Sequence, residues 1–320
     1  MFQIKRFTLS SIVLLTLIAG GAFAVSAQLR VPRPSQKASV IQTIGVTDLS
    51  ITYSRPGVKG RKIWGDAPPD VYAKGEATLD DQNKRPAGMP IVPYGHVWRT
   101  GANEATQFVV TDDVLINGQP LAAGSYSLHT IPGKDRWVIV FNGQANQWGS
   151  FNYDPKNDTL RVKAKPQATA DHQEFFAFTI DPTADNAVQV SIRWEKVRVP
   201  FTVEVKDVVA TTLTKARAAV AAAKPDDWAT PYNAAVYARS NKAAEDAPKW
   251  FEQSLRAAEE QLKVKETFPA LNRKVNSLVA LGRTQEAIAV AEKAVDRGKA
   301  DKVDTAALEK RIVDMKAGKN

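Results

Sequence analysis

The densest group of chemically capable side chains lies in residues 92–106, immediately before an apolar run. Arg99 can make a planar two-pronged contact with a carboxylate or phosphate, and Asn103 can donate and accept hydrogen bonds. Glu104 can accept a proton. Gly101 interrupts the stretch, as a bulge or a close approach of two backbones would require. We therefore expect this stretch to line a polar ligand site.

Three further segments are polar or aromatic enough to contribute to the same site. Residues 53–61 are basic and rich in turn residues, residues 127–132 place a histidine inside a strand pattern, and residues 147–153 offer aromatic rings that suit stacking against sugars. The predicted ligand-binding residues are Arg55, His96, Trp98, Arg99, Asn103, Glu104, His129 and Trp148. The ligand that suits them is small and polar or anionic, such as a glycan.

The same residues allow two other interpretations. In a hydrolase acting on carbohydrate or cell-envelope material, Glu104 and His129 would be the acid–base pair and Arg99 would stabilise charge. In a structural envelope protein, Arg99 and Glu104 would form an internal ion pair and His129 would be a buried structural histidine. Gly-x-Ser-x-Gly, P-loop, GxGxxG and HExxH motifs are absent. The residue types leave all three interpretations open.

Composition excludes several kinds of chemistry. The chain has no cysteine, and therefore no disulfide, thiolate zinc site, iron–sulfur cluster or thiol nucleophile. Its three histidines, His96, His129 and His172, are too few for a histidine-rich metal site. We expect no metal and no cofactor, so any chemistry would rely on carboxylate, imidazole, guanidinium and hydroxyl groups.

The elements that must position these residues are predicted to be strands over the first two thirds of the chain. Between about Ala38 and Val205, runs rich in β-branched residues alternate with turn residues, and helical periodicity is absent. Asn117-Gly118 predicts a tight hairpin, because both residues tolerate positive φ. The pattern predicts roughly nine or ten strands. It favours an all-β antiparallel sandwich of jelly-roll type over 34–206.

After Asp207 the pattern becomes helical, and 207–320 is predicted to be an all-α domain. The motif at 247–255 recurs at 287–295, and residues 278–294 resemble a tetratricopeptide repeat. Such repeats stack helix pairs because one pair cannot bury its apolar face alone. A five-helix bundle without a groove is the alternative. If these helices form a repeat module, we expect them to bind a protein partner.

The N-terminus has the features of a secretory signal peptide. Lys5 and Arg6 precede an apolar run, Ile12–Ala19, that is shorter than the ~20 residues of a membrane span. Small residues place the cleavage between Ala27 and Gln28. An uncleaved anchor helix is the alternative. We expect residues 1–27 to be removed and the mature protein to be exported, periplasmic or extracellular, and soluble without a membrane anchor.

The charge distribution argues against a nucleic-acid partner. Removing Lys5 and Arg6 lowers the formal net charge from +9 to +7 (9 − 2), and the excess is spread over both parts of the chain. A nucleic-acid binder concentrates its basic residues on one face.

A hydrophobic fraction of 44% and a charged fraction of 24% exclude wholesale disorder and a multispan membrane protein.

Several motifs together resemble a bacterial family. The runs at 37–45, 54–61, 97–106, 126–133, 148–153 and 193–201 are similar to the domain-of-unknown-function family 2911 (DUF2911). The resemblance covers roughly Pro34 to Val205. It implies an exported bacterial protein, often with repeat-like helices behind the domain, and it implies no activity. This chain departs from the family by an insertion at 67–89, which we expect to be a surface loop.

These observations favour an exported binding protein. The β domain is predicted to engage the small polar ligand, and the helical domain is predicted to engage the protein partner.

Overall fold

The computed structural model describes residues 31–66, 88–241, 243 and 245–319. The chain divides into two units, Met1–Pro34 and Ser35–Asn320, and the described strands and helices all belong to the second. The predicted signal peptide (1–27) lies outside the described residues, as does the predicted insertion (67–89) apart from its last two residues.

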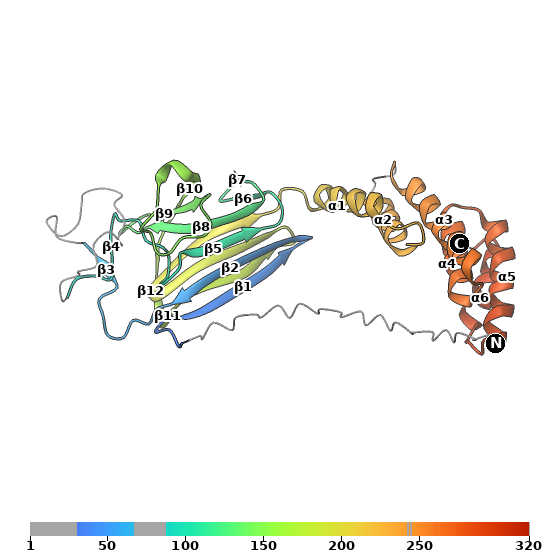
Figure 1. Cartoon of the computed structure of the whole chain (residues 1–320), viewed down its shortest axis with the longest axis horizontal. Coiled ribbons are helices and arrows are strands. Elements are labelled where there is room, and N and C mark those ends of the chain that lie inside the picture. Colours follow the sequence, from blue (N-terminus) through green and yellow to red (C-terminus); the bar gives the residue numbers. More distant parts are fainter. Residues whose placement is uncertain (1–30, 67–87, 242, 244, 320) are drawn as a thin grey trace, which may run out of the picture. The chain divides into compact units, whose positions relative to one another are not determined.

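The larger sheet is antiparallel and has six strands in the order β1-β2-β5-β8-β9-β10 (Figure 1). These are β1 (Gln36–Ile44), β2 (Thr47–Arg55), β5 (Thr106–Val110), β8 (Gly124–Ile131), β9 (Trp137–Asn142) and β10 (Asp158–Ala164). The order ascends along the chain, and β6 and β7 leave it for the second sheet. Residues 92–106 therefore enter the middle of this sheet through β5.

The second antiparallel sheet has the order β11-β12-β6-β7. Its strands are β6 (Val114–Ile116), β7 (Gln119–Leu121), β11 (Gln167–Ala184) and β12 (Ala187–Glu204), and β3 (Trp64–Gly65) pairs in parallel with β4 (Val92–Pro93). The predicted antiparallel β structure is confirmed. In this second sheet the last strand along the chain, β12, lies beside the first, β6, and the jelly-roll type stays a prediction.

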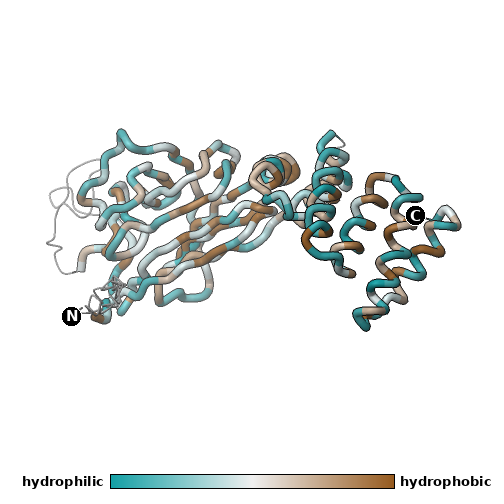
Figure 2. Tube along the Cα trace, turned by 45° about the vertical axis from the view of Figure 1, so that its right-hand side comes forward, coloured by the Kyte–Doolittle hydropathy of each residue, from teal (hydrophilic) through white to brown (hydrophobic). Residues whose placement is uncertain are grey.

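Both sheets contribute inward side chains to one hydrophobic core. On β2, Leu49, Ile51 and Tyr53 are buried, and the residues between them point to the opposite face, as the period of a strand requires. Hydrophobic and hydrophilic residues alternate accordingly along the strands in Figure 2. Within the core the rings of Trp98 and Trp194 stack with centroids 5.8 Å apart. This aromatic packing fills the space between the inner faces of the two sheets.

The long strand β12 differs from the prediction. The sequence predicts separate strands at 187–194 and 197–205, whereas β12 runs through both. Glu195 adopts a φ of 56°, and the register with β11 shifts beside it. A bulged residue thus lets the pairing continue where the residue pattern predicts an end.

Six helices follow the strands. They are α1 (Val208–Ala222), α2 (Ala229–Ser240), α3 (Ala247–Val264), α4 (Phe268–Ala280), α5 (Thr284–Ala300) and α6 (Ala306–Lys316). The helices pack in chain order, each against the next. Asp207 caps α1 by accepting a hydrogen bond from the Ala210 N–H at 2.8 Å. No described helix combines the length and apolarity needed to cross a membrane.

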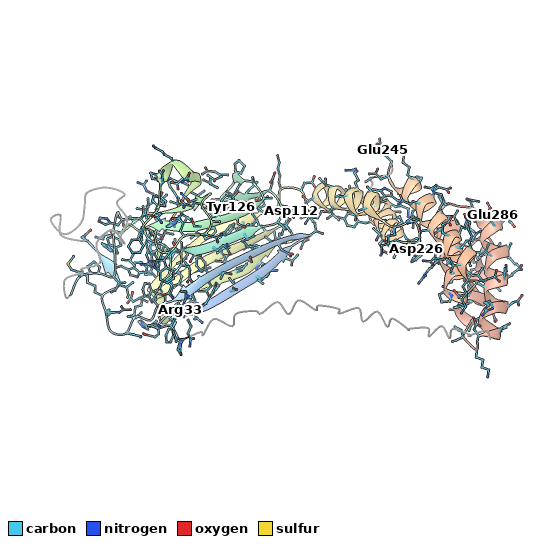
Figure 3. All side chains as sticks on the ribbon, viewed as in Figure 1. Arg33, Asp112, Tyr126, Asp226, Glu245 and Glu286 are labelled. Carbon is cyan, nitrogen blue, oxygen red and sulfur yellow. The ribbon has the colours of Figure 1, made fainter. Side chains whose placement is uncertain are left out.

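Helix α5 begins at Thr284 without a hydroxyl N-cap, and Arg283 precedes it. Arg283 donates two hydrogen bonds, of 2.7 and 2.6 Å, to the carboxylate of Glu286. Glu286, labelled in Figure 3, lies in the first turn of α5. The acidic side chain there complements the positive end of the helix dipole in place of a hydroxyl cap.

The predicted Asn117-Gly118 hairpin is confirmed, and it also joins the two sheets. Both residues have positive φ, 48° and 79°, between β6 and β7. Asn117 Nδ2 donates to the Lys163 carbonyl on β10 at 3.0 Å, and Asn117 Oδ1 accepts from the Thr202 N–H on β12 at 2.8 Å. One side chain therefore links strands of both sheets.

Asn117→Gly should lower the free energy of unfolding by about 1–3 kcal/mol, because it removes these hydrogen bonds and keeps the positive φ. Asn117→Ala should lower it further, since a Cβ disfavours that backbone region. Urea unfolding followed by tryptophan fluorescence measures both. Wild-type stability in Asn117→Gly would show that the amide does not hold the sheets together.

Candidate functional site

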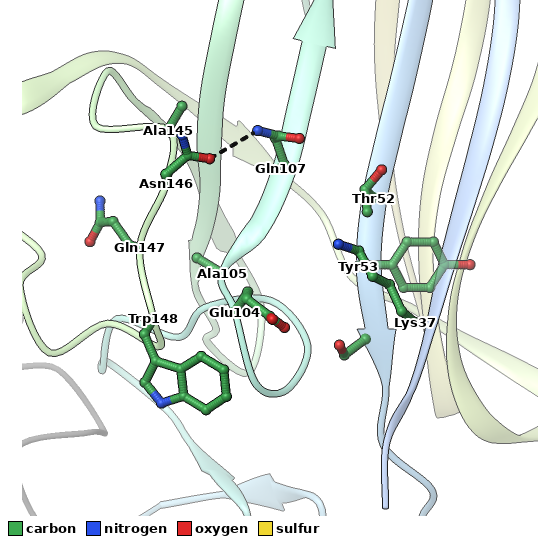
Figure 4. Close-up of a pocket in the computed structure, with 11 residues that line it drawn as sticks. Lys37, Thr52, Tyr53, Glu104, Ala105, Gln107, Ala145, Asn146, Gln147 and Trp148 are labelled. Atoms are coloured by element: carbon green, nitrogen blue, oxygen red, sulfur yellow. Dashed lines mark hydrogen bonds between the residues drawn. The ribbon is translucent and has the colours of Figure 1, made fainter. Parts of the chain in front are cut away.

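A pocket of about 260 Å³ lies on the outer face of the six-stranded sheet (Figure 4). Its lining residues are Lys37, Thr52, Tyr53, Ser54, Glu104, Ala105, Gln107, Ala145, Asn146, Gln147 and Trp148. Thr52 and Gln107 occupy the outward positions next to core residues Ile51 and Phe108. Alternation along β2 and β5 therefore presents polar groups to the pocket.

The second wall of the pocket is the loop between β9 and β10, which pairs with the segment before β5. Glu104 and Trp148 form an isolated antiparallel bridge. The Ala105 N–H donates to the Gln147 carbonyl at 3.0 Å, and the Gly149 N–H donates to the Asn103 carbonyl at 3.0 Å. This backbone pairing fixes Glu104 and Trp148 beside each other at the mouth of the pocket.

Trp148 is the aromatic group of this site that reaches solvent. All seven tryptophans of the chain are described, and Trp148, at 55% exposure, is the only one that is exposed. Exposing an indole forgoes a large gain from burial, and at a ligand site that loss is recovered when the ligand covers it. The sequence prediction of Trp148 as a ligand-contacting residue fits this placement.

Two charged side chains line the pocket, Lys37 from β1 and Glu104 from the segment before β5. Lys37 forms no ion pair with any described residue. Asn146 accepts a hydrogen bond from Gln107 Nε2 at 3.3 Å across the floor between loop and strand. The pocket lining thus contains a cation, a carboxylate, three side-chain amides (Gln107, Asn146 and Gln147) and an exposed indole.

Most of the predicted site residues outside the pocket hold backbone groups. Arg55 Nε donates to the Phe176 carbonyl at 3.0 Å, Trp98 Nε1 to the Gly101 carbonyl at 3.1 Å, and Arg99 Nη1 to the Asn103 carbonyl at 2.8 Å. Asn103, with a φ of 61°, donates from Nδ2 to the Ser35 carbonyl at 3.1 Å and to Ser54 Oγ at 3.2 Å. Trp98, Arg99 and Asn103 shape the loop that carries Glu104, whereas Arg55 links the end of β2 to β11. None of these four residues lines the pocket.

The predicted histidines are buried and lie outside the pocket lining. His96 is 7% exposed. His129 is fully buried on β8, with Nε2 3.2 Å from Ser127 Oγ and its ring 4.9 Å from that of Tyr153. The structure does not bring Glu104 and His129 together in the pocket, because only Glu104 lines it.

The comparison with known families gives a match over most of the β part. A family model described as "Protein of unknown function (DUF2911)" matches residues 35–203. The chain belongs to the DUF2911 family. No curated protein and no solved structure matches it. The DUF2911 match includes every residue that lines the pocket and ends before α1.

Within the DUF2911 region, sequence reasoning missed several lining residues, among them Lys37, Thr52, Gln107 and Asn146. The alternation of polar and apolar residues in each strand does predict that the strand side chains among them point outward. It does not predict that β1, β2 and β5 are neighbours in the sheet, because the order of the strands depends on tertiary pairing. No group of three or more His, Asp or Glu residues in the described part could hold a metal ion.

A polar network lies beneath the loop that carries Trp148. Gln147 Nε2 donates to Ser127 Oγ at 3.1 Å and to Asn142 Oδ1 at 3.2 Å. His129 lies in the same layer, and burial lowers its pKa to about 4, with Asp158 opposing the shift and Arg99 adding to it. The Nδ1 atom of His129 has no hydrogen-bond partner among the described residues. The histidine is therefore neutral at pH 7.

Because the folded state holds His129 neutral down to about pH 4, the unfolded state takes up the proton first, near pH 6.5. We expect the free energy of unfolding to fall by about 3 kcal/mol between pH 6.5 and 4 through this group, and to show no such loss above pH 6.5. Urea unfolding of wild type and His129→Gln at a series of pH values isolates the effect.

Parallel pH curves for the two proteins would contradict this prediction. Should His129→Gln fail to fold, an NMR titration of the wild-type imidazole gives the same answer. A pKa near 6.5 for His129 would then overturn the prediction.

Proposed function

We propose that the DUF2911 region binds a saccharide in the Lys37–Glu104–Trp148 pocket. The observation that carries the proposal is the exposed indole of Trp148, fixed by backbone pairing beside the carboxylate of Glu104. A tryptophan face stacks against the apolar C–H face of a sugar ring, while carboxylate and amide groups at its edge bind the hydroxyls.

The size and polarity of the pocket support a sugar over a hydrophobic ligand. Its volume of about 260 Å³ lies below the ~300–1,000 Å³ of sites for drug-sized molecules and suits a single ring. Thr52, Gln107 and Asn146 supply hydroxyl and amide groups, which both donate and accept hydrogen bonds. The lone cation, Lys37, favours a sugar that carries a carboxylate, such as a uronic acid.

Binding is supported better than hydrolysis. Glycoside hydrolysis ordinarily uses two carboxyl groups that flank the bond to be cleaved. Glu104 is the only acidic residue among the described residues that line the pocket, and His129 is buried away from it. No observation at the site favours the hydrolase alternative, so the proposal assigns Glu104 to hydrogen bonding.

The proposal extends to the rest of the chain. A signal peptide (1–27) would export the protein, a two-sheet sandwich (34–206) would carry the saccharide site, and tetratricopeptide-like helices (207–320) would bind a protein partner. The repeat is supported by burial: Ala247, Phe251 and Leu255 on α3 are buried, and so are Ala287, Ala291 and Val295 at the same spacing on α5. Equivalent positions of the two helices are thus buried, and Leu255 shares one hydrophobic cluster with the three α5 residues.

Trp148→Ala should weaken saccharide binding at least ~10-fold, because it removes the stacking surface. Titration calorimetry with galacturonic acid, glucuronic acid, N-acetylglucosamine and glucose measures the loss. Phe151→Ala is the matched control, since Phe151 is exposed on the same loop and does not line the pocket. Absence of binding to all four sugars, or equal binding by Trp148→Ala, would refute the proposed function.

Lys37→Gln should abolish the preference for uronic acids over glucose and leave the affinity for glucose within about twofold. The preference should also shrink with added salt in the wild type, because the charges meet at a solvated surface. Lys163→Gln is the control, because Lys163 is exposed on β10 and does not line the pocket. An unchanged preference in Lys37→Gln would show that the lysine does not contact the ligand.

A further inference from the structure

The register of the six-stranded sheet aligns one row of polar side chains across all of its strands. The row consists of Ser39, Thr52, Gln107, Ser127, Asn142 and Asp158, each the pairing partner of the next. Alternation places all of them on the outer face, since their strand neighbours, such as Ile51, Phe108 and Leu128, belong to the core. The row therefore runs perpendicular to the strands, through the pocket.

The loop between β9 and β10 closes one half of this row. Ser127 and Asn142 are fully buried, and both accept hydrogen bonds from Gln147 Nε2. Asn142 Nδ2 donates to Asp158 Oδ1 at 2.8 Å. The polar groups on β8, β9 and β10 satisfy one another beneath the loop, so they are closed to a ligand.

The other half of the row is open. Ser39 is exposed and Thr52 is half-buried, and their hydroxyl oxygens lie 2.8 Å apart. One hydrogen bond between two hydroxyls uses one of their two donors, so the pair keeps a donor and several lone pairs for a ligand. Gln107 lies at the boundary, where it donates to Asn146 of the loop. The row thus leads from the pocket to β1, the edge strand of the sheet.

We infer that the pocket is the end of a longer site, and that a linear acidic oligosaccharide lies along the open row from Trp148 over Thr52 to Ser39. This inference rests on the saccharide site proposed above and adds its direction and length. The open row crosses β5, β2 and β1, which are neighbouring strands. Its length is therefore two strand spacings, about 10 Å, which is longer than one sugar ring. The loop blocks extension the other way, so the chain enters with one terminal ring in the pocket.

Oligogalacturonides of one to four rings test the inference, with affinity measured by calorimetry on the whole protein. The tetramer should bind about tenfold more tightly than the monomer, through hydrogen bonds to the two hydroxyls. Ser39→Ala, which removes the hydroxyl at the far end of the row and lies outside the pocket lining, should reduce this ratio to about two and leave the monomer affinity unchanged. Ser50→Ala, an outward hydroxyl on β2 outside the row, should keep the full ratio.

Each alternative result separates the site from its extension. Equal affinity for all four lengths, lost in Trp148→Ala, would overturn the extended site and keep the pocket. A tetramer advantage that stays tenfold in Ser39→Ala would also overturn it, because the extra rings would then lie elsewhere. If no length binds, or if Trp148→Ala binds every length as well as wild type, the proposed function and this inference both fail.

Discussion

The site depends on one short antiparallel pairing between two segments without long strands of their own, 103–105 and 147–149. Two backbone hydrogen bonds of 3.0 Å flank the Glu104–Trp148 bridge and set the two side chains next to each other. The pairing needs the chain before it to turn sharply against β2. Gly101 allows this turn: its φ is 148°, and a Cβ there would lie only 3.0 Å from the Ser54 carbonyl oxygen.

The polar stretch at 92–106 is both a brace and part of a binding surface, and its residues divide between the two roles by position. Trp98 packs in the aromatic core, and its indole N–H holds the Gly101 carbonyl. Arg99 and Asn103 tie the following turn to itself and to β2. Of the polar residues in this stretch, only Glu104 lines the pocket, next to Ala105. A preorganised loop of this kind lowers the entropic cost of binding, because little remains to be ordered.

Much of the fold was predictable from local pattern, and the missing part has a common cause. Strand runs such as 125–131 and the Asn117-Gly118 turn depend on residues close in sequence, and both are confirmed. The order of strands within the sheets depends on distant pairing, which the local residue pattern does not determine. For the site, Trp148 and Glu104 are prominent residue types. Thr52 and Gln107 are ordinary strand residues that become neighbours only through register.

The loop between β9 and β10 covers only part of the outer face of the six-stranded sheet, so some polar residues of this face are buried and others are exposed. Covering Ser127 and Asn142 removes them from water, and partners that replace the lost hydrogen bonds offset this cost. Gln147 supplies such bonds to Ser127 and Asn142. Nothing comparable covers Ser39 among the described residues. The loop between β9 and β10 covers only half of the polar row, so its edge forms a wall of the pocket. The exposed indole of Trp148 belongs to this wall.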